Sequence, residues 1–378
     1  MQPKHAKIAV VLLVLAAVAL LPANALAQHY QQTNLVSDVP GLAPHTEPDL
    51  VNSWGLVRGP ATPWWVNDNG TGLAQLYMGN GTKVILQVGT VTVPAVTIPP
   101  PTGSTATSTP TGIAFNGGTG FVVTKGTASA ASRFIFATED GTISAWSPTV
   151  DPSNAILTVN HSGSAIYKGL TISSDNTLLY AANFLSGKVD VFDSHFAPTT
   201  VSGGFVDTAL PPGYAPFNVQ NINGDIFVTF AKQGTPPDEV DGRGFGFVDK
   251  FDQDGNLLLR FQHGPWMNAP WGVALAPANF GKFSNDLLVG QFGSGRMAAF
   301  NAANGEFRGF LHGRRGPLVI DGLWALGFGA GNANSGPTNT LFFTAGINDE
   351  QDGLFGTLTA VPDKDKDKDK EDDKDDED

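Results

Sequence analysis

The chain has 378 residues, a formal net charge of −13 and no cysteine. The lack of cysteine excludes disulfides and thiol chemistry, and the acidic balance disfavours nucleic acid as a partner, because binding nucleic acid needs clustered Lys and Arg. With 41% hydrophobic residues, 45 Gly and 26 Pro, the composition indicates a large core whose elements are joined by many tight turns.

The first 27 residues have the pattern of a cleavable export signal. Lys4 and Lys7 precede an apolar run from Ile8 to Leu21, and Ala25-Leu26-Ala27 offers an Ala-x-Ala cleavage site. The run is shorter than the roughly 20 apolar residues that span a bilayer. We therefore expect a protein exported to the periplasm, the cell surface or the medium, with no transmembrane span after cleavage.

A short motif, Gly followed by an apolar run, recurs along the rest of the chain. Its clearest copy is Trp271-Gly272-Val273-Ala274, in a unit from Asn268 to Phe307 that has the pattern of four short strands. Copies are anchored at positions 55, 112, 169, 218, 272 and 323, which lie 49 to 57 residues apart, with Asn at 218 and a looser match at 323. Six such units predict an all-β fold: one six-bladed β-propeller of four-stranded antiparallel blades, spanning residues 28–362.

The two ends of this domain are expected to meet in one blade. Residues Tyr30 to Val36 alternate polar and apolar side chains and precede the first motif. They predict an outermost strand for the sixth blade, whose other strands are Leu323 to Phe328, Leu341 to Ala345 and Gly353 to Thr359. Such a closure would hide the free edges of the sheet.

Three segments depart from the repeat. Thr90 to Pro110 is rich in Pro, Thr and Ser, and Gln233 to Gly246 interrupts the fourth unit. Each segment is either a loop that binds a ligand or partner, or a solvent-exposed insertion without a function. The tail from Asp363 to Asp378 has eleven acidic residues and five lysines and no apolar residue. This composition predicts a disordered, solubilising tail, with weak collection of Ca²⁺ as the other possibility.

Several stretches together resemble a known protein family. NSWGLVRGPATPWWVNDNGTGLAQLY, ANFLSGKVDVFD, APWGVALAP and DGLWALGFG are similar to segments of a family of uncharacterised exported bacterial β-propeller proteins, known as conserved hypothetical proteins. The motif copies resemble, more distantly, NHL-type and gluconolactonase-like six-bladed propellers. The closer resemblance implies the fold and no reaction. The gluconolactonase-like propellers imply a divalent cation held near the axis by carboxylate and amide oxygens.

Polar residues at the predicted turns near the axis provide candidate ligands for such a cation. Loops that precede the innermost strands and turns between the second and third strands open on one face, where side chains from all blades converge. Ca²⁺ takes six to eight oxygen ligands, and the candidate metal set is Asp68, Glu139, Asn183, Asn218 and Asp321. The alternative is that these side chains bond their own turns, as Asp and Asn commonly do.

Two hypotheses for function stay open. The first is an exported binding or scaffold module that uses the polar axial face and the two long loops, with a small molecule, a glycan or an extracytoplasmic protein as partner. The second is a metal-dependent hydrolase or lyase acting on a small lactone-like or ester-like substrate at the axis. No complete catalytic signature such as G-x-S-x-G is present. Nothing in the sequence requires an oligomer, and we expect a monomer.

Overall fold

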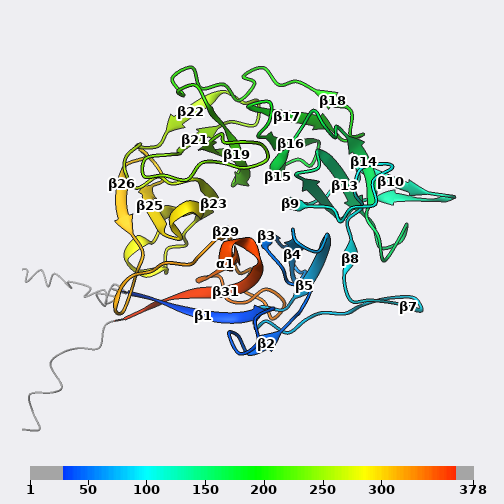
Figure 1. Cartoon of the computed structure of the whole chain (residues 1–378), viewed down its shortest axis with the longest axis horizontal. Helices are drawn as coiled ribbons and strands as arrows, with labels where there is room; N and C mark the ends of the chain where they lie inside the picture. Colours follow the sequence, from blue (N-terminus) through cyan, green and yellow to red (C-terminus); the bar gives the residue numbers. More distant parts are fainter. Residues whose placement is uncertain (1–28, 363–378) are drawn as a thin grey trace, which may run out of the picture.

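The computed structural model describes residues 29–362. These residues form a ring of six antiparallel sheets around a central axis (Figure 1). The fold predicted from the repeat is confirmed. From the inner to the outer strand, blade 1 is β3 (Ser53–Val57), β4 (Trp64–Asp68), β5 (Leu73–Tyr77) and β8 (Val96–Thr97); blade 2 is β9 (Pro110–Phe115), β12 (Phe134–Thr138), β13 (Thr142–Trp146) and β14 (Ile156–Asn160). Blade 3 is β15 (Tyr167–Ile172), β16 (Leu178–Asn183), β17 (Lys188–Asp193) and β18 (Pro198–Thr199); blade 4 is β19 (Tyr214–Ile222), β20 (Asp225–Lys232), β21 (Phe247–Phe251) and β22 (Leu257–Arg260). Blade 5 is β23 (Pro270–Leu275), β24 (Asp286–Gln291), β25 (Met297–Asn301) and β26 (Phe307–Phe310); blade 6 is β29 (Leu323–Phe328), β30 (Thr340–Gly346), β31 (Asp352–Val361) and β1 (His29–Ser37).

Short elements decorate the blades. β2 (His45–Thr46) pairs with β1. Three hairpins are formed by β6 (Leu86–Val88) with β7 (Val91–Val93), β10 (Val122–Lys125) with β11 (Ala128–Ala131), and β27 (His312–Gly313) with β28 (Gly316–Pro317). The short helices are the 3-10 helices η1 (Gly281–Phe283) and η2 (Phe292–Ser294) and α1 (Ile347–Glu350). No helix within residues 29–362 is long and apolar enough to cross a membrane. The predicted export signal and acidic tail lie outside the described residues.

The motif glycines let the inner strands of adjacent blades approach closely. A Cβ atom at Gly112 of blade 2 would lie 2.3 Å from the main-chain nitrogen of Leu170 in blade 3. A Cβ at Gly272 of blade 5 would lie 2.3 Å from the carbonyl oxygen of Trp324 in blade 6. Where the motif has Asn218 instead, its amide donates to the carbonyl of Trp271 at 2.8 Å and links blade 4 to blade 5. The motif therefore marks the positions where the inner strands of adjacent blades lie closest to each other.

The N-terminal strand closes the ring as predicted. β1 pairs antiparallel with β31 from His29↔Val361 to Ser37↔Leu354, so the first described strand is the outermost strand of the last blade. Tyr30 ties this strand to blade 5, because its hydroxyl donates to the carbonyl of Phe280 at 3.0 Å. In Figure 1 the two ends of the described chain, blue and red, run side by side.

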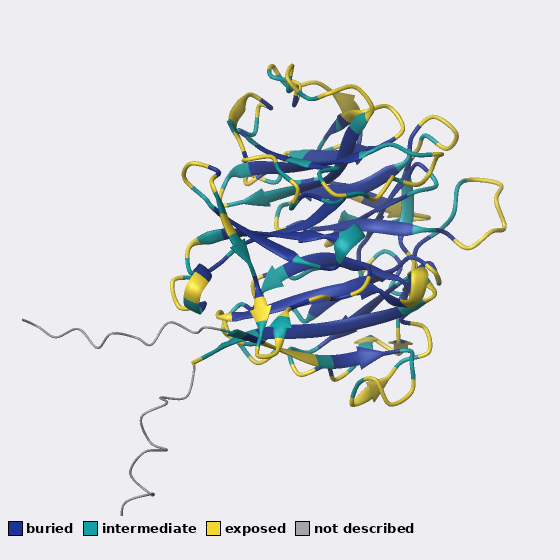
Figure 2. Ribbon diagram, turned by 60° about the vertical axis from the view of Figure 1, so that its left-hand side comes forward, coloured by how far each residue is buried: buried dark blue, intermediate teal, exposed yellow. Residues whose placement is uncertain are grey.

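The core lies between the blades, where adjacent sheets face each other. Trp64 and Trp65 follow each other in β4 and point to opposite faces of blade 1. Trp64 packs against Phe342 of blade 6 at 4.9 Å between ring centroids, and Trp65 packs against Phe134 of blade 2 at 4.0 Å. Each tryptophan thus fills a different gap between blades. The burial pattern in Figure 2 shows the same arrangement, with buried strands and exposed loops.

The two internal segments that depart from the repeat have different structures. Part of Thr90 to Pro110 completes blade 1 after all, because β8 pairs with the edge of β5. The hairpin of β6 and β7 precedes it. Gln233 to Gly246 joins β20 to β21 and reaches the axial face, where it places Glu239 beside blade 3.

Candidate functional site

The innermost strand of every blade is irregular at the motif. In each of the six innermost pairs the register shifts there, which frees one or two residues from the ladder. A bulge of this kind bends the strand and redirects a side chain. The redirected residues are Trp54, Thr111, Lys168, Phe217, Trp271 and Trp324, and all six are buried. Four of them are aromatic and pack together around the axis.

Lys168 brings a charge into this aromatic setting. Its side chain is 2% exposed, and its ammonium lies 2.5 Å from a carboxylate oxygen of Glu139 and 3.9 Å from one of Glu239. The same nitrogen lies 4.8 Å from the ring centroid of Trp54 and 5.8 Å from that of Phe217. An ammonium over an aromatic face is stabilised by the ring quadrupole. The indole N–H of Trp54 has no acceptor among residues 29–362.

Two amides and a third carboxylate extend the site. The Asn69 amide donates to Glu139 at 3.0 Å, and the Asn52 amide donates to Glu350 at 2.7 Å. Asn52 also accepts from the indole N–H of Trp324 at 3.1 Å, which connects the site to the aromatic layer. We refer to these six residues, Asn52, Asn69, Glu139, Lys168, Glu239 and Glu350, as the axial cluster. Five of the six blades contribute to it; in blade 5 the corresponding position is Gln291, which accepts from the main chain of Asn268.

The local fold around Glu350 is strained. α1 is not a regular right-handed helix, because Asn348, Asp349 and Glu350 have φ values of 55°, 53° and 61°. Residues with a Cβ atom, that is, all except Gly, disfavour this left-handed region. Asp321 supports the turn by accepting from the main-chain N–H of Asn348 at 2.9 Å. Strain of this kind often accompanies a side chain held in place for function.

The positive φ of Asp349 leads to a prediction about the free energy of unfolding. Its side chain is exposed, so replacing it with Gly relieves the backbone without disturbing a buried contact. We expect Asp349→Gly to raise the free energy of unfolding by about 1 kcal/mol, measured by urea denaturation. The nearby Asp352 lies in β31 and has no positive φ to relieve, so the control Asp352→Gly should give no gain.

The charges of the axial cluster are unbalanced. Burial alone would lower the pKa of Lys168, but the nearby carboxylates of Glu139 and Glu239 outweigh it and raise that pKa, so the lysine is a cation. Burial raises the pKa of Glu239 to about 7 although Lys168 opposes the shift. Burial also raises the pKa of Glu350. Three carboxyl groups therefore share one ammonium, and two of them hold their protons more tightly than an exposed Glu does.

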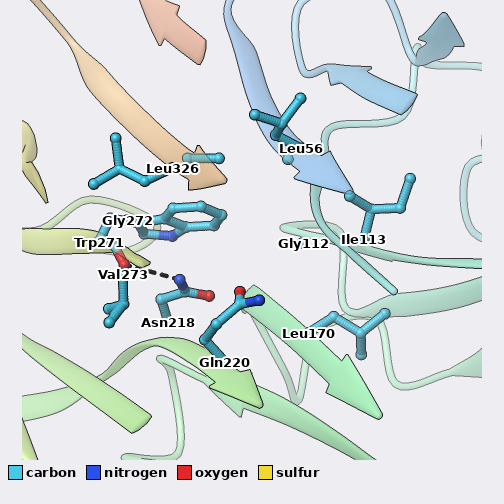
Figure 3. A pocket seen from close by; sticks show the side chains of 12 residues that line it. Leu56, Gly112, Ile113, Leu170, Asn218, Gln220, Trp271, Gly272, Val273 and Leu326 are labelled. Carbon is cyan, nitrogen blue, oxygen red and sulfur yellow. Dashed lines mark hydrogen bonds between the residues drawn. The ribbon is translucent and has the colours of Figure 1, made fainter. Parts of the chain in front are cut away.

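The axis is closed beneath the aromatic layer. A cavity of about 10 Å³ lies one or two residues further along the inner strands, and its lining includes Leu56, Ile113, Leu170 and Leu326 (Figure 3). This is about the space that one water molecule needs. Residues 29–362 thus leave no wide channel at this level, and we expect a ligand at the axial cluster to approach from the face that carries α1.

The structure does not bring the five predicted metal ligands together. Only Glu139 lies in the axial cluster. Asn183 donates to Asp190 and accepts from the main-chain N–H of Ser186, Asn218 bonds main-chain groups of blades 4 and 5, and Asp321 supports the turn of α1. Within residues 29–362, no three His, Cys, Asp or Glu side chains are grouped so that they could hold a metal ion. The alternative of bonding within the residue's own turn describes Asn183. It does not describe Asn218, which donates to the carbonyl of Trp271, or Asp321, which accepts from the N–H of Asn348.

Asp68, the remaining member, is fully buried in blade 1, and the charged groups that act on it are Lys83, Glu47, Asp49 and Asp38 rather than those of the axial cluster. Burial raises its pKa well above the ordinary value, although Lys83 opposes the shift, and one carboxylate oxygen has no partner among the described residues. A raised pKa means that the folded state holds a proton more tightly than the unfolded state. This group therefore opposes folding increasingly as the pH rises above the unfolded pKa of about 4.

We expect Asp68→Asn to raise the free energy of unfolding by about 1–2 kcal/mol near neutral pH. The gain should fade below about pH 4, where the carboxyl is protonated in both states. Denaturant titrations of both proteins across this pH range provide the measurement. A gain that does not depend on pH would show that the carboxyl proton is not its cause.

Sequence reasoning missed Lys168 and Glu239. Lys168 stands directly before the motif residue Gly169, where other units have Trp54, Phe217 and Trp271. A single cation at a position that is mostly aromatic was a usable signal. No comparable signal pointed to Glu239, because it lies in an insertion that has no counterpart in the other units.

The comparison with known sequences finds relatives of this chain among viral proteins. It is 32% identical over 334 residues to the uncharacterised protein R648 of Acanthamoeba polyphaga mimivirus, which covers 86% of this chain and 78% of that protein. It is 33% identical over 334 residues to protein L690 of the same virus, covering 86% and 84%. No protein-family model matches the chain. The bacterial origin that the sequence resemblance implied is therefore wrong, since these relatives are viral.

The comparison with solved structures supports the fold alone. A streptogramin B lyase aligns with a TM-score of 0.51 and 11% identity, over 88% of this chain and 98% of that one. A protein of unknown function from Bacteroides thetaiotaomicron aligns with a TM-score of 0.50 and 10% identity, over 87% and 76%. At such low identity, shared architecture does not transfer a reaction.

Proposed function

The chain belongs to the family of these uncharacterised mimivirus proteins, and we propose that it is a binding module that holds a small organic cation at the axial cluster. The observation that carries the proposal is the excess of carboxyl groups around a buried lysine. Lys168 balances Glu139, its partner at 2.5 Å, whereas Glu239 lies 3.9 Å from the ammonium and the bond to Glu350 comes from a neutral amide. Export, which the leader sequence predicts, is part of the same proposal.

An ammonium or guanidinium group suits this site for two reasons. Buried carboxylates are stable when they are paired with a cation and hydrogen-bonded, and such a ligand supplies both the charge and the donors. The aromatic rings beneath the cluster already hold one ammonium, that of Lys168, over Trp54. The same physical preference extends to a second organic cation nearby.

A second candidate is acid–base catalysis at the same place. Glu239, with a pKa of about 7, lies beside the protonated Lys168. A carboxyl that titrates near neutral pH can accept or return a proton, and the ammonium can stabilise a developing negative charge. This arrangement suits a hydrolase or lyase acting on a small lactone or ester, without requiring the metal set predicted from the sequence.

A thermal-shift comparison of matched compounds tests the binding proposal. We expect ethylammonium chloride to raise the melting temperature, while its neutral analogue ethanol does not, at equal ionic strength. Glu350→Gln should weaken the effect, and Asp349→Asn, which changes an exposed neighbour, should leave it intact. Equal shifts with charged and neutral compounds would contradict the proposal.

A further inference from the structure

A groove follows the outer edge of blade 3. This edge lies on the rim of the ring, away from the axial cluster (Figure 1). Its volume is about 370 Å³, within the range of ligand sites. One wall is the edge of β17 from Lys188 to Phe192, and the other is the segment from Pro198 to Gly204. The groove occupies the place where a fourth strand continues in a complete blade.

The outer strand of blade 3 stops early. β18 pairs with β17 only at Val191↔Thr199 and Phe192↔Pro198, so Lys188, Val189 and Asp190 have no strand partner on this side among residues 29–362. Bonds in an antiparallel ladder alternate between the two sides of a strand. Because the main-chain N–H of Asp193 bonds outward to Ala197, Val191 and Val189 also direct their N–H and C=O groups outward.

Blade 1 shows that a short outer strand need not leave such an edge. β8 is also only two residues long and pairs with Leu73 and Ala74. The rest of the edge of β5 is covered, because Tyr77 bridges to Lys83 and the N–H of Val84 donates to the carbonyl of Leu76. Blade 3 has no equivalent cover beside Val189 in the described part of the chain.

The two faces of the exposed edge differ in chemistry. Val189 is buried and packs with the apolar cluster between blades 3 and 4, near Val201. Asp190 points to the other face, where it accepts from the Tyr167 hydroxyl at 3.1 Å and from the Asn183 amide at 2.9 Å. Lys188, two residues before it, is exposed on the same face as Asp190.

We propose that this groove binds an extended peptide segment of a partner protein, which pairs antiparallel with Lys188–Asp190 as the missing part of the fourth strand. Cross-strand neighbours share a face. A residue opposite Val189 therefore needs a β-branched apolar side chain, one opposite Asp190 a basic side chain, and one opposite Lys188 an acidic side chain. Since the strands run in opposite directions, the segment reads basic, β-branched, acidic from its N-terminus.

Fluorescence anisotropy with short capped peptides on the full chain tests this assignment. The probe is an acetyl-capped Lys-Val-Asp-Thr peptide with its dye at the C-terminus, because a residue before the Lys would lie opposite Val191, which Thr199 already pairs with. We expect saturable binding. Exchanging its two charges should weaken binding about threefold or more, because both cross-strand pairs become repulsive. Replacing its Val with Pro should abolish binding, because Pro has no N–H to pair with Val189.

Charge reversal on the protein separates this groove from other surfaces. Lys188→Glu should weaken binding of the probe and favour a Lys-Val-Lys-Thr peptide, whereas Lys282→Glu, an exposed lysine on blade 5, should change neither affinity. No saturable binding of the probe, or equal binding of the Pro peptide, would overturn the proposal. Binding of the probe that is unchanged by Lys188→Glu would also overturn the proposal.

Discussion

Replacing Lys168 with Met lowers the free energy of unfolding by about 3 kcal/mol near neutral pH, as measured by urea denaturation. The reason is that removing one partner of a buried ion pair leaves the other charge uncompensated. Glu139 loses a partner at 2.5 Å, and the ammonium is also lost from its place over Trp54. Met keeps a similar length of apolar chain, so the change removes charge and hydrogen bonds more than packing.

Two further variants identify the cause of that loss. The double variant Lys168→Met with Glu139→Gln should recover much of the stability, because a neutral amide replaces the unpaired carboxylate and can still bond to Asn69. Lys188→Met, at an exposed lysine, should cost little. If Lys168→Met unfolds as wild type does, the ion pair described for the axial cluster is not formed.

Replacing Trp324 with Ala lowers the free energy of unfolding by about 4 kcal/mol, because it leaves a cavity in the aromatic layer that closes the axis. Trp324 is fully buried and lies 3.8 Å from Trp54 and 4.0 Å from Phe292 between ring centroids. It also donates to Asn52. The loss should therefore extend to cation binding at the axial cluster.

The matched control is Trp266→Ala, which removes the same residue type from a partly exposed position. Trp266 stacks on Phe307 at 4.2 Å, so a smaller loss, about 1 kcal/mol, is expected there. Equal losses at both positions would mean that the axial layer carries no special share of the stability.

Much of the fold could be predicted because its physical requirements recur. Gly112 and Gly272 mark points where adjacent blades touch through the backbone, and a requirement repeated in most blades leaves a period in the sequence. Closure by Tyr30 to Val36 could be predicted because a ring leaves the last blade without an outer strand. The bulges at the motif could not, because an extra residue breaks the two-residue alternation by which side chains are assigned to faces.

The axial cluster was harder to predict for the same reason. Glu139 was among the turn residues singled out, since turns between second and third strands recur in every unit. Lys168 faces the axis only because a bulge redirects it. Glu239 depends on the path of an insertion that occurs once. Asp68 resembled a ligand in sequence, yet the structure buries it in blade 1, where Lys83 and not Lys168 is the cation that acts on it.

The most direct test of the proposed function is calorimetric titration with ethylammonium at about pH 6 and about pH 8. Glu239 has a pKa of about 7, so it is mainly protonated at the lower pH and mainly ionised at the higher one. Cation binding should be up to about tenfold tighter at the higher pH. Glu239→Gln should remove this dependence, while the exposed control Asp238→Asn should keep it. Affinity that is unchanged by pH and by Glu239→Gln would contradict a cation site at the axial cluster.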